Sequence, residues 1–186
     1  MITIYSEQHR LRNAKSELHG GILVEPFDKP SRAQFIVDRI ESVNLGPIIE
    51  PKDFGLEPVT AVHEAGYIQF LQSAWCEWSK HEFPGEAITT VWPARRMSKR
   101  IPNHIEGKLG YYSLSSETSI SEGTWEASYA SAQVAVTAAE QLLSGEQSAF
   151  ALCRPPGHHA AKDMYGGYCF LNNAAIAAQF LSLIHI

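Results

Sequence analysis

An alanine-rich segment and the apolar run that follows it narrow the folds open to this chain. Residues 124–143 are long enough for a helix of several turns, and Gly145 stands where helices commonly end. Residues 148–153 form a short, continuously apolar run, which is typical of a parallel strand covered on both faces. A loop and a second alanine-rich segment, residues 174–181, come next. This order of helix, turn, buried strand, loop and helix predicts an α/β fold.

The rest of the chain adds further strands and helices. Residues 2–5 and 48–49 predict two short strands, and residues 31–43 and 63–78 predict helices from the spacing of their apolar side chains. The polar, glycine-containing stretch 10–21 has no clear period and is predicted to be an ordered loop. At roughly 150 residues per domain, a chain of 186 residues predicts one domain.

Residues 80–122 differ from their surroundings. They contain three prolines, three glycines and the basic residues Arg95, Arg96, Lys99 and Arg100. A connection of this length inside a compact domain is usually a functional loop or a disordered one. Its aromatic residues favour order, and its basic group is typical of a solvated surface. The segment is therefore predicted to be a long, ordered loop insertion.

Composition excludes several classes of protein. Fifteen basic and twenty acidic residues give a net charge of −5, which argues against nucleic acid or an anionic membrane as a partner. No apolar run reaches the roughly 18 residues of a membrane span, and residues 1–7 lack the features of a secretion signal. Cys76, Cys153 and Cys169 have neither disulfide-framework nor zinc-knuckle spacing. These features predict a cytoplasmic protein with free thiols.

The strongest chemical signal follows the predicted strand at 148–153. The sequence CRPPGHHA occupies residues 153–160, and GGYCFLNN occupies residues 166–173. In open α/β sheets, ligands bind at the carboxyl ends of the strands. Two prolines fix the backbone and Gly157 permits an unusual turn, so His158 and His159 are expected to point into one pocket. Histidine moves protons near neutral pH, so the pair is predicted to be catalytic.

These residues also allow other interpretations. Adjacent histidines are often plain surface residues, and neighbouring histidines seldom bind the same metal ion. A cysteine nucleophile, Cys153 or Cys169 served by a histidine, is an alternative that their apolar flanks disfavour. Gly166 and Gly167 bring the backbone close to whatever binds in the pocket, so that a backbone carbonyl is available to contact it. The ring of Tyr168 offers a flat surface for an aliphatic chain.

The two motifs resemble the signature of the zinc-dependent histone deacetylase superfamily. The segment VHEAGYIQFL at 62–71 is similar to an early helix of that family. More narrowly, residues 12–15, 19–21, 105–107 and 123–127 resemble bacterial acetylpolyamine amidohydrolases. The likeness covers residues 1–181.

This resemblance implies an arginase/deacetylase-like fold with a mainly parallel sheet flanked by helices. It implies one Zn²⁺, which polarises an acetamide carbonyl and activates a water. His159 would act as general base and then general acid, with His158 as an electrostatic partner. Gly167 would offer its carbonyl to the substrate amide, and Tyr168 would line the tunnel.

The family's zinc ligands and its oxyanion tyrosine do not occur within the matched motifs. They are expected downstream, so residues 1–181 are predicted to be the N-terminal portion of a single deacetylase domain and inactive alone. The sequence stops inside a helical pattern, and residues 182–186 are expected to be a non-native tail. Half of a parallel sheet would also expose an unpaired strand edge.

The resemblance also suggests the substrate. Residues 80–122 resemble the insertion through which the polyamine enzymes form homodimers and narrow the active-site entrance, and Glu106 and Glu117 fall where those enzymes place carboxylates. A carboxylate in a confined channel would attract a cationic amine. The predicted substrates are small acetylated amines, with acetylpolyamines preferred. Protein acetyl-lysine, a non-catalytic binding module and a ureohydrolase using two Mn²⁺ are the alternatives, although the histidine motif does not resemble that of the ureohydrolases.

Overall fold

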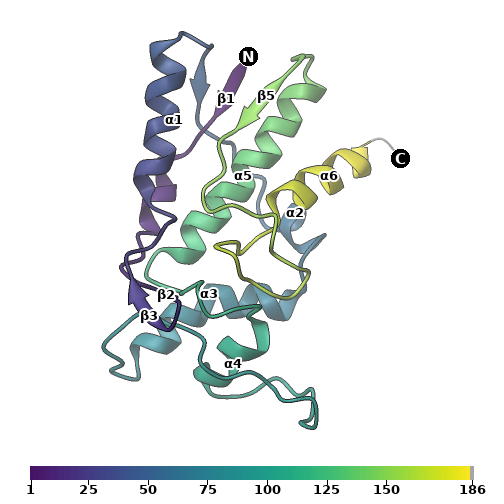
Figure 1. The fold of residues 1–186 in the computed structure, drawn as a ribbon. Helices are drawn as coiled ribbons and strands as arrows, with labels where there is room; N and C mark the ends of the chain where they lie inside the picture. The colour runs from purple at the N-terminus through teal and green to yellow at the C-terminus, as the bar shows by residue number, and fades with distance from the viewer. Residues whose placement is uncertain (185–186) are drawn as a thin grey trace.

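A parallel sheet between helices forms one half of the molecule (Figure 1). The structure is a computed structural model that describes residues 1–184. The strand order is β4-β1-β5, and Thr3 pairs with Ile48 on one side and Phe150 on the other. The strands are β1 (Ile2–Ile4), β4 (Ile48–Ile49) and β5 (Ala149–Ala151). The predicted α/β fold, with a mainly parallel sheet flanked by helices, is confirmed.

Each face of this sheet packs on a different helix because successive strand residues point to opposite sides. Helix α1 (Pro30–Ser42) covers the face that carries Tyr5 and Leu152. Helix α5 (Thr124–Leu143) covers the face that carries Ile4, which is fully buried. Figure 1 shows β1 and β5 lying between the two helices. Coverage on both faces explains why residues 149–153 are apolar without alternation.

The largest group of buried apolar side chains lies beyond the end of the sheet. It is formed by helices α3 (Ala65–Ser79), α4 (Ile105–Tyr112), α5 and α6 (Asn173–Ile184) with residues 165–171. The ring of Phe70 stacks on Tyr112 with centroids 4.7 Å apart, and the Tyr67 hydroxyl donates a 2.6 Å hydrogen bond to the Phe170 carbonyl. This aromatic core fixes residues 165–170 in place.

The segment 80–122 is ordered and contributes to that core through Ile105, Leu109 and Ile120. Its helix α4 was not predicted, because Gly107 and Gly110 were taken as signs of a loop. The structure gives these glycines another purpose: a Cβ on Gly110 would lie 1.8 Å from the Val91 carbonyl oxygen. The glycines allow residues 91–102 to cross α4 at close range.

The stretch 10–21 is more regular than predicted. Strands β2 (Glu17–His19) and β3 (Ile22–Val24) form an antiparallel hairpin, and Gly20 and Gly21 both have positive φ at its turn. Positive φ at both central residues is typical of the type I′ turn that joins hairpin strands. The short helices η1 (Glu7–Leu11) and α2 (Glu57–Thr60) complete the described elements.

Two sequence expectations concern the ends of elements. Helix α6 continues through residues 182–184 of the expected non-native tail, and the last two residues of that tail lie outside the described part of the chain. Within the described part, β5 forms one edge of the sheet. None of the helices in residues 1–184 combines the length and apolar character of a membrane span.

Candidate active site

The loop that carries the two histidines begins at the carboxyl end of β5. Arg154 and Pro155 are buried, whereas His158 and His159 are exposed in this chain. Gly157 is not among the glycines with positive φ. Instead, a Cβ on Gly157 would lie 2.5 Å from both the Asn173 nitrogen and the Leu171 carbonyl oxygen. The glycine is needed because two stretches of backbone pass in contact.

The structure brings His158 and His159 together. Their ring centroids are 4.2 Å apart, with an angle of 46° between the ring planes. The ring of His159 also lies against the backbone of Gly167, where an added Cβ would be 2.4 Å from His159 Cδ2. Gly167 thus makes room for the imidazole of His159.

Gly167 and Tyr168 are held by the end of the 80–122 segment. Glu117 Oε1 accepts hydrogen bonds from the Gly167 nitrogen at 3.2 Å and from Ser115 Oγ at 2.5 Å. The Tyr168 nitrogen donates to Thr118 Oγ1 at 2.8 Å. Both Gly167 and Tyr168 have positive φ, at 56° and 65°. These hydrogen bonds hold a strained turn in place beside the histidines.

Glu17 completes this group and was missed by the sequence analysis. Its side chain is buried, and its Oε1 accepts a 3.1 Å hydrogen bond from the Tyr168 hydroxyl. Burial and then this hydrogen bond raise the pKa of Tyr168 to about 12. Glu17 Oε2 accepts from the Phe27 nitrogen at 3.1 Å. The only sequence signal is an acidic residue three positions before a glycine pair, in a stretch predicted to be a loop.

Glu106 is not brought into this group of contacts. It is an exposed residue in the first turn of α4, with Oε2 3.5 Å from Nδ1 of His104. Of the two carboxylates chosen from the sequence, the structure places Glu117 against the glycine turn and Glu106 on the surface of the insertion.

The cysteines do not have the surroundings of a catalytic thiol. Burial raises the pKa of Cys153 to about 11, and burial also raises the pKa of Cys169. Reactive cysteines have lowered pKa values, so these shifts argue against the cysteine-nucleophile alternative.

Metal binding requires several ligands to converge. Among residues 1–184, no group of three or more histidine, cysteine, aspartate or glutamate side chains is arranged to hold an ion. The described residues therefore do not form a zinc site.

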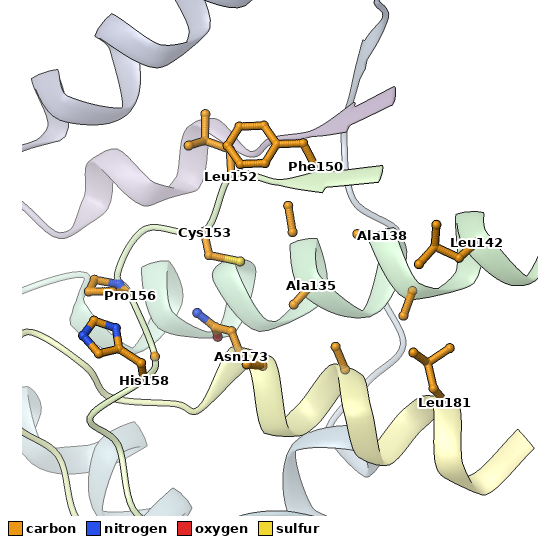
Figure 2. Close-up of a pocket in the computed structure, with 15 residues that line it drawn as sticks. Ala135, Ala138, Leu142, Phe150, Leu152, Cys153, Pro156, His158, Asn173 and Leu181 are labelled. Carbon is orange, nitrogen blue, oxygen red and sulfur yellow. The ribbon is translucent and has the colours of Figure 1, made fainter. Parts of the chain in front are cut away.

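A groove of about 540 Å³ runs along α5, β5 and α6, with His158 at one end (Figure 2). In Figure 2, Leu142 and Leu181 lie at the opposite end, and Phe150 and Leu152 lie along its upper side. Half of its other residues are alanines from the two helices. Because these walls are apolar, the groove has the character of a packing surface rather than of a site for a charged amine.

Comparison with known proteins decides the family. The family model described as the histone deacetylase domain matches residues 26–185. The chain belongs to this family. The resemblance seen in its two motifs is confirmed.

Several members of the histone deacetylase domain family are similar over nearly the whole chain. An acetylpolyamine amidohydrolase of Mycoplana ramosa is 52% identical over 181 residues, which are 97% of this chain and 53% of that protein. Acetylpolyamine amidohydrolase 1 of Pseudomonas aeruginosa is also 52% identical, over 96% of this chain and 52% of its own length.

A crystal structure of acetylpolyamine aminohydrolase from Burkholderia pseudomallei shares the fold, with a TM-score of 0.90 and 34% identity over 98% of this chain and 53% of that one. The chain therefore spans about half the length of the family members that it matches.

Proposed function

We propose that this chain belongs to a zinc-dependent amidohydrolase that removes acetyl groups from small acetylated amines, with acetylpolyamines as its substrates. Residues 1–181 would form the N-terminal portion of its single deacetylase domain. The observation that carries this proposal is the packing of His158 and His159 beside the Gly167–Tyr168 turn. The names of the similar proteins support the choice of acetylpolyamines.

Amide hydrolysis requires a proton to leave water and to reach the departing nitrogen. His159 is proposed to hold that proton in turn as general base and general acid, and the adjacent ring of His158 would stabilise its charge. The Gly167 carbonyl accepts a 3.3 Å hydrogen bond from Cys169 Sγ and keeps a second lone pair. It can thus accept the N–H of the substrate amide and orient the scissile bond.

Zinc would supply polarisation of the carbonyl and activation of water. Because residues 1–184 contain no fitting cluster, we place its ligands in a part of the protein outside this chain.

The acidic side chains around Tyr168 suit a cationic chain of methylene groups. Both hydrogen bonds to Glu117 are accepted by Oε1, so Oε2 can accept one from a substrate ammonium. The ring of Tyr168, held by Glu17, would pack against the methylenes. Half-buried carboxylates attract cations more strongly than carboxylates in bulk water.

The insertion 80–122 is proposed to form a homodimer contact that narrows the entrance, with Glu106 facing incoming amines. Its large apolar side chains support this role, because Trp92, Met97 and Ile101 are 42%, 64% and 48% exposed. We place the complete enzyme in the cytoplasm.

The test is acetate release by the zinc-loaded protein from the complete reading frame. We expect higher kcat/KM for an acetylated diamine than for an acetyl-lysine peptide. Higher kcat/KM for the peptide would favour a protein deacetylase, and tight binding of both without turnover would favour a non-catalytic module.

The substitution Glu117→Gln tests charge recognition within the same assay. Glutamine can still accept the hydrogen bond from Gly167, so the turn should survive while the charge is lost. A charged hydrogen bond contributes about 1.5–3 kcal/mol, so kcat/KM for the acetylated diamine should fall by roughly tenfold or more. A neutral acetamide of equal length should lose much less. Equal losses of kcat/KM for the two substrates would show that Glu117 does not bind the substrate ammonium.

A further inference from the structure

The arginine that begins the histidine loop has no part in the proton transfers above. Arg154 is only 5% exposed. One guanidinium nitrogen, Nη1, donates to the carbonyl oxygens of His9 at 2.8 Å and Arg12 at 3.0 Å. The other, Nη2, donates to the carbonyl oxygen of Asp28 at 3.0 Å, and Nε lies 3.3 Å from Asp28 Oδ1.

These acceptors belong to two segments near the start of the chain. His9 is in η1, Arg12 follows η1, and Asp28 precedes α1. The hairpin that carries Glu17 lies between Arg12 and Asp28. The guanidinium thus fastens the start of the histidine loop to both ends of the segment from which Glu17 reaches Tyr168.

The contacts close into a ring through the candidate site. From Arg154 the chain runs to His159, whose imidazole rests on Gly167. Tyr168, the next residue, donates to Glu17, and the turns on either side of Glu17 accept hydrogen bonds from Arg154. Loosening the arginine would therefore release both the imidazoles and Tyr168.

The shape of the side chain explains why an arginine stands here. A guanidinium is a rigid fork with five donors, so it can reach several carbonyls and a carboxylate at once. A lysine ammonium carries the same charge on a flexible stem and has no planar fork. It could stay near Asp28 but could not donate to all three carbonyl oxygens in the same geometry.

We propose that Arg154 is a positioning residue, which sets the placement of the His158 and His159 imidazoles by fastening their loop to the backbone at His9, Arg12 and Asp28. This inference rests on the proposed function only for its kinetic consequence. The positioning of the imidazoles can be measured without any turnover.

The first test compares Arg154→Lys and Arg154→Met with the wild-type protein from the complete reading frame. A catalytic group displaced by about 1 Å can cost roughly 100-fold in rate. We expect kcat to fall by about that factor in Arg154→Lys and further in Arg154→Met, with KM within about threefold of wild type. Arg154→Met leaves the buried Asp28 carboxylate with only the exposed Arg32 as a charged partner, so Arg154→Lys decides the question if the methionine variant fails to fold.

Gln133→Met is the matched control. Gln133 is also buried, and its amide joins α5 to the backbone of Phe54 and Gly55 rather than to the histidine loop. This variant should lose stability but keep kcat. If Gln133→Met loses as much kcat as Arg154→Lys at the same loss of melting temperature, Arg154 has only a general structural role.

The second test uses the imidazole resonances of protein labelled with ¹⁵N-histidine. In Arg154→Lys, the resonances of His158 and His159 should shift or broaden. Those of His81 and His104, whose tilted rings lie 4.6 Å apart between the end of α3 and the start of α4, should stay in place. Unchanged His158 and His159 resonances would overturn the proposal. If only the His158 and His159 resonances change but the wild-type protein has no deacetylase activity, the positioning role of Arg154 is supported and the proposed function is contradicted.

Discussion

Gly157 and Gly167 are both confined, but by different neighbours. At Gly157 the obstacle to a side chain is the backbone of residues 171–173, which cannot move without shifting α6. At Gly167 the obstacle is the ring of His159, and the φ of +56° adds backbone strain for any other residue. A substitution at Gly157 would therefore act on stability, whereas one at Gly167 would act on the imidazole.

Gly167→Ala should disturb the reaction more than the fold. The added methyl would push the His159 ring away, so we expect kcat to fall by roughly 100-fold. The left-handed φ should reduce the free energy of unfolding by about 1–2 kcal/mol. Gly85→Ala is the control, because its Cβ would meet nothing within 4 Å and its φ is not positive. Full activity in Gly167→Ala would show that His159 does not depend on this contact.

Individual residues were predictable where chemistry and local sequence coincide. The prolines, glycine and adjacent histidines of residues 153–160 predicted that the two imidazoles would lie together, and their ring centroids are 4.2 Å apart. Glu17 and the partners of Arg154 were not predictable. Their contacts join positions 151 and 126–145 residues apart, and no local pattern encodes such pairings.

The hairpin of β2 and β3 is the element that holds Glu17 toward Tyr168. Gly20 and Gly21 have φ of +58° and +84°, and an added Cβ would meet no atom within 4 Å at either residue. Their role is thus conformational rather than steric.

Gly21→Ala should lower the free energy of unfolding by about 1 kcal/mol, because alanine is strained at positive φ. Gly21→Asn should cost less, because asparagine tolerates the left-handed region. Urea denaturation of the two variants and the wild type measures the difference. Equal stability of all three would mean that the turn does not hold this conformation in solution.

Elements were predicted well where one pattern dominated. Helix α5 and strand β5 were found because an alanine-rich helix, a glycine stop and an apolar strand follow in order. Helix α4 and the hairpin were not predicted because glycine occurs both in irregular loops and in regular elements that pack closely or turn sharply. It allowed close packing at Gly110 and a hairpin turn at Gly20, yet both were taken as signs of irregular structure.

At the scale of the whole molecule, buried polar groups make stability depend on pH. His9 is 3% exposed, and its Nε2 lies 2.8 Å from the Tyr5 hydroxyl. Burial, followed by the positive charge of Arg154, lowers the pKa of His9 to about 4. Burial also lowers the pKa of His63. Both histidines are thus held neutral in the folded state.

Stability should therefore fall as the solution becomes acidic. A histidine titrates near 6.5 in the unfolded chain, so above this pH the folded and unfolded states both carry neutral His9. Between about pH 6.5 and pH 4 only the unfolded state gains the proton, which lowers the free energy of unfolding by up to about 3 kcal/mol. His9→Gln should reduce this dependence, leaving the part due to His63. Urea denaturation of both proteins at pH 7.5 and pH 5 measures this difference. If the free energy of unfolding falls equally in the variant and the wild type, groups other than His9 cause the pH dependence.

The family and the general architecture were accessible from sequence, because the motifs are specific and the α/β pattern is strong. The zinc centre was not accessible, since the described residues contain no cluster that could form it.

One measurement tests the central role of the histidine pair most directly. It combines zinc content and acetate release for His159→Ala and wild type, both from the complete reading frame and assayed on an acetylated diamine. We predict equal zinc content and a loss of turnover of at least roughly 1,000-fold, because general acid and base catalysis are both removed. Loss of zinc in the variant would make His159 a ligand, and retained turnover would show that another group moves the proton.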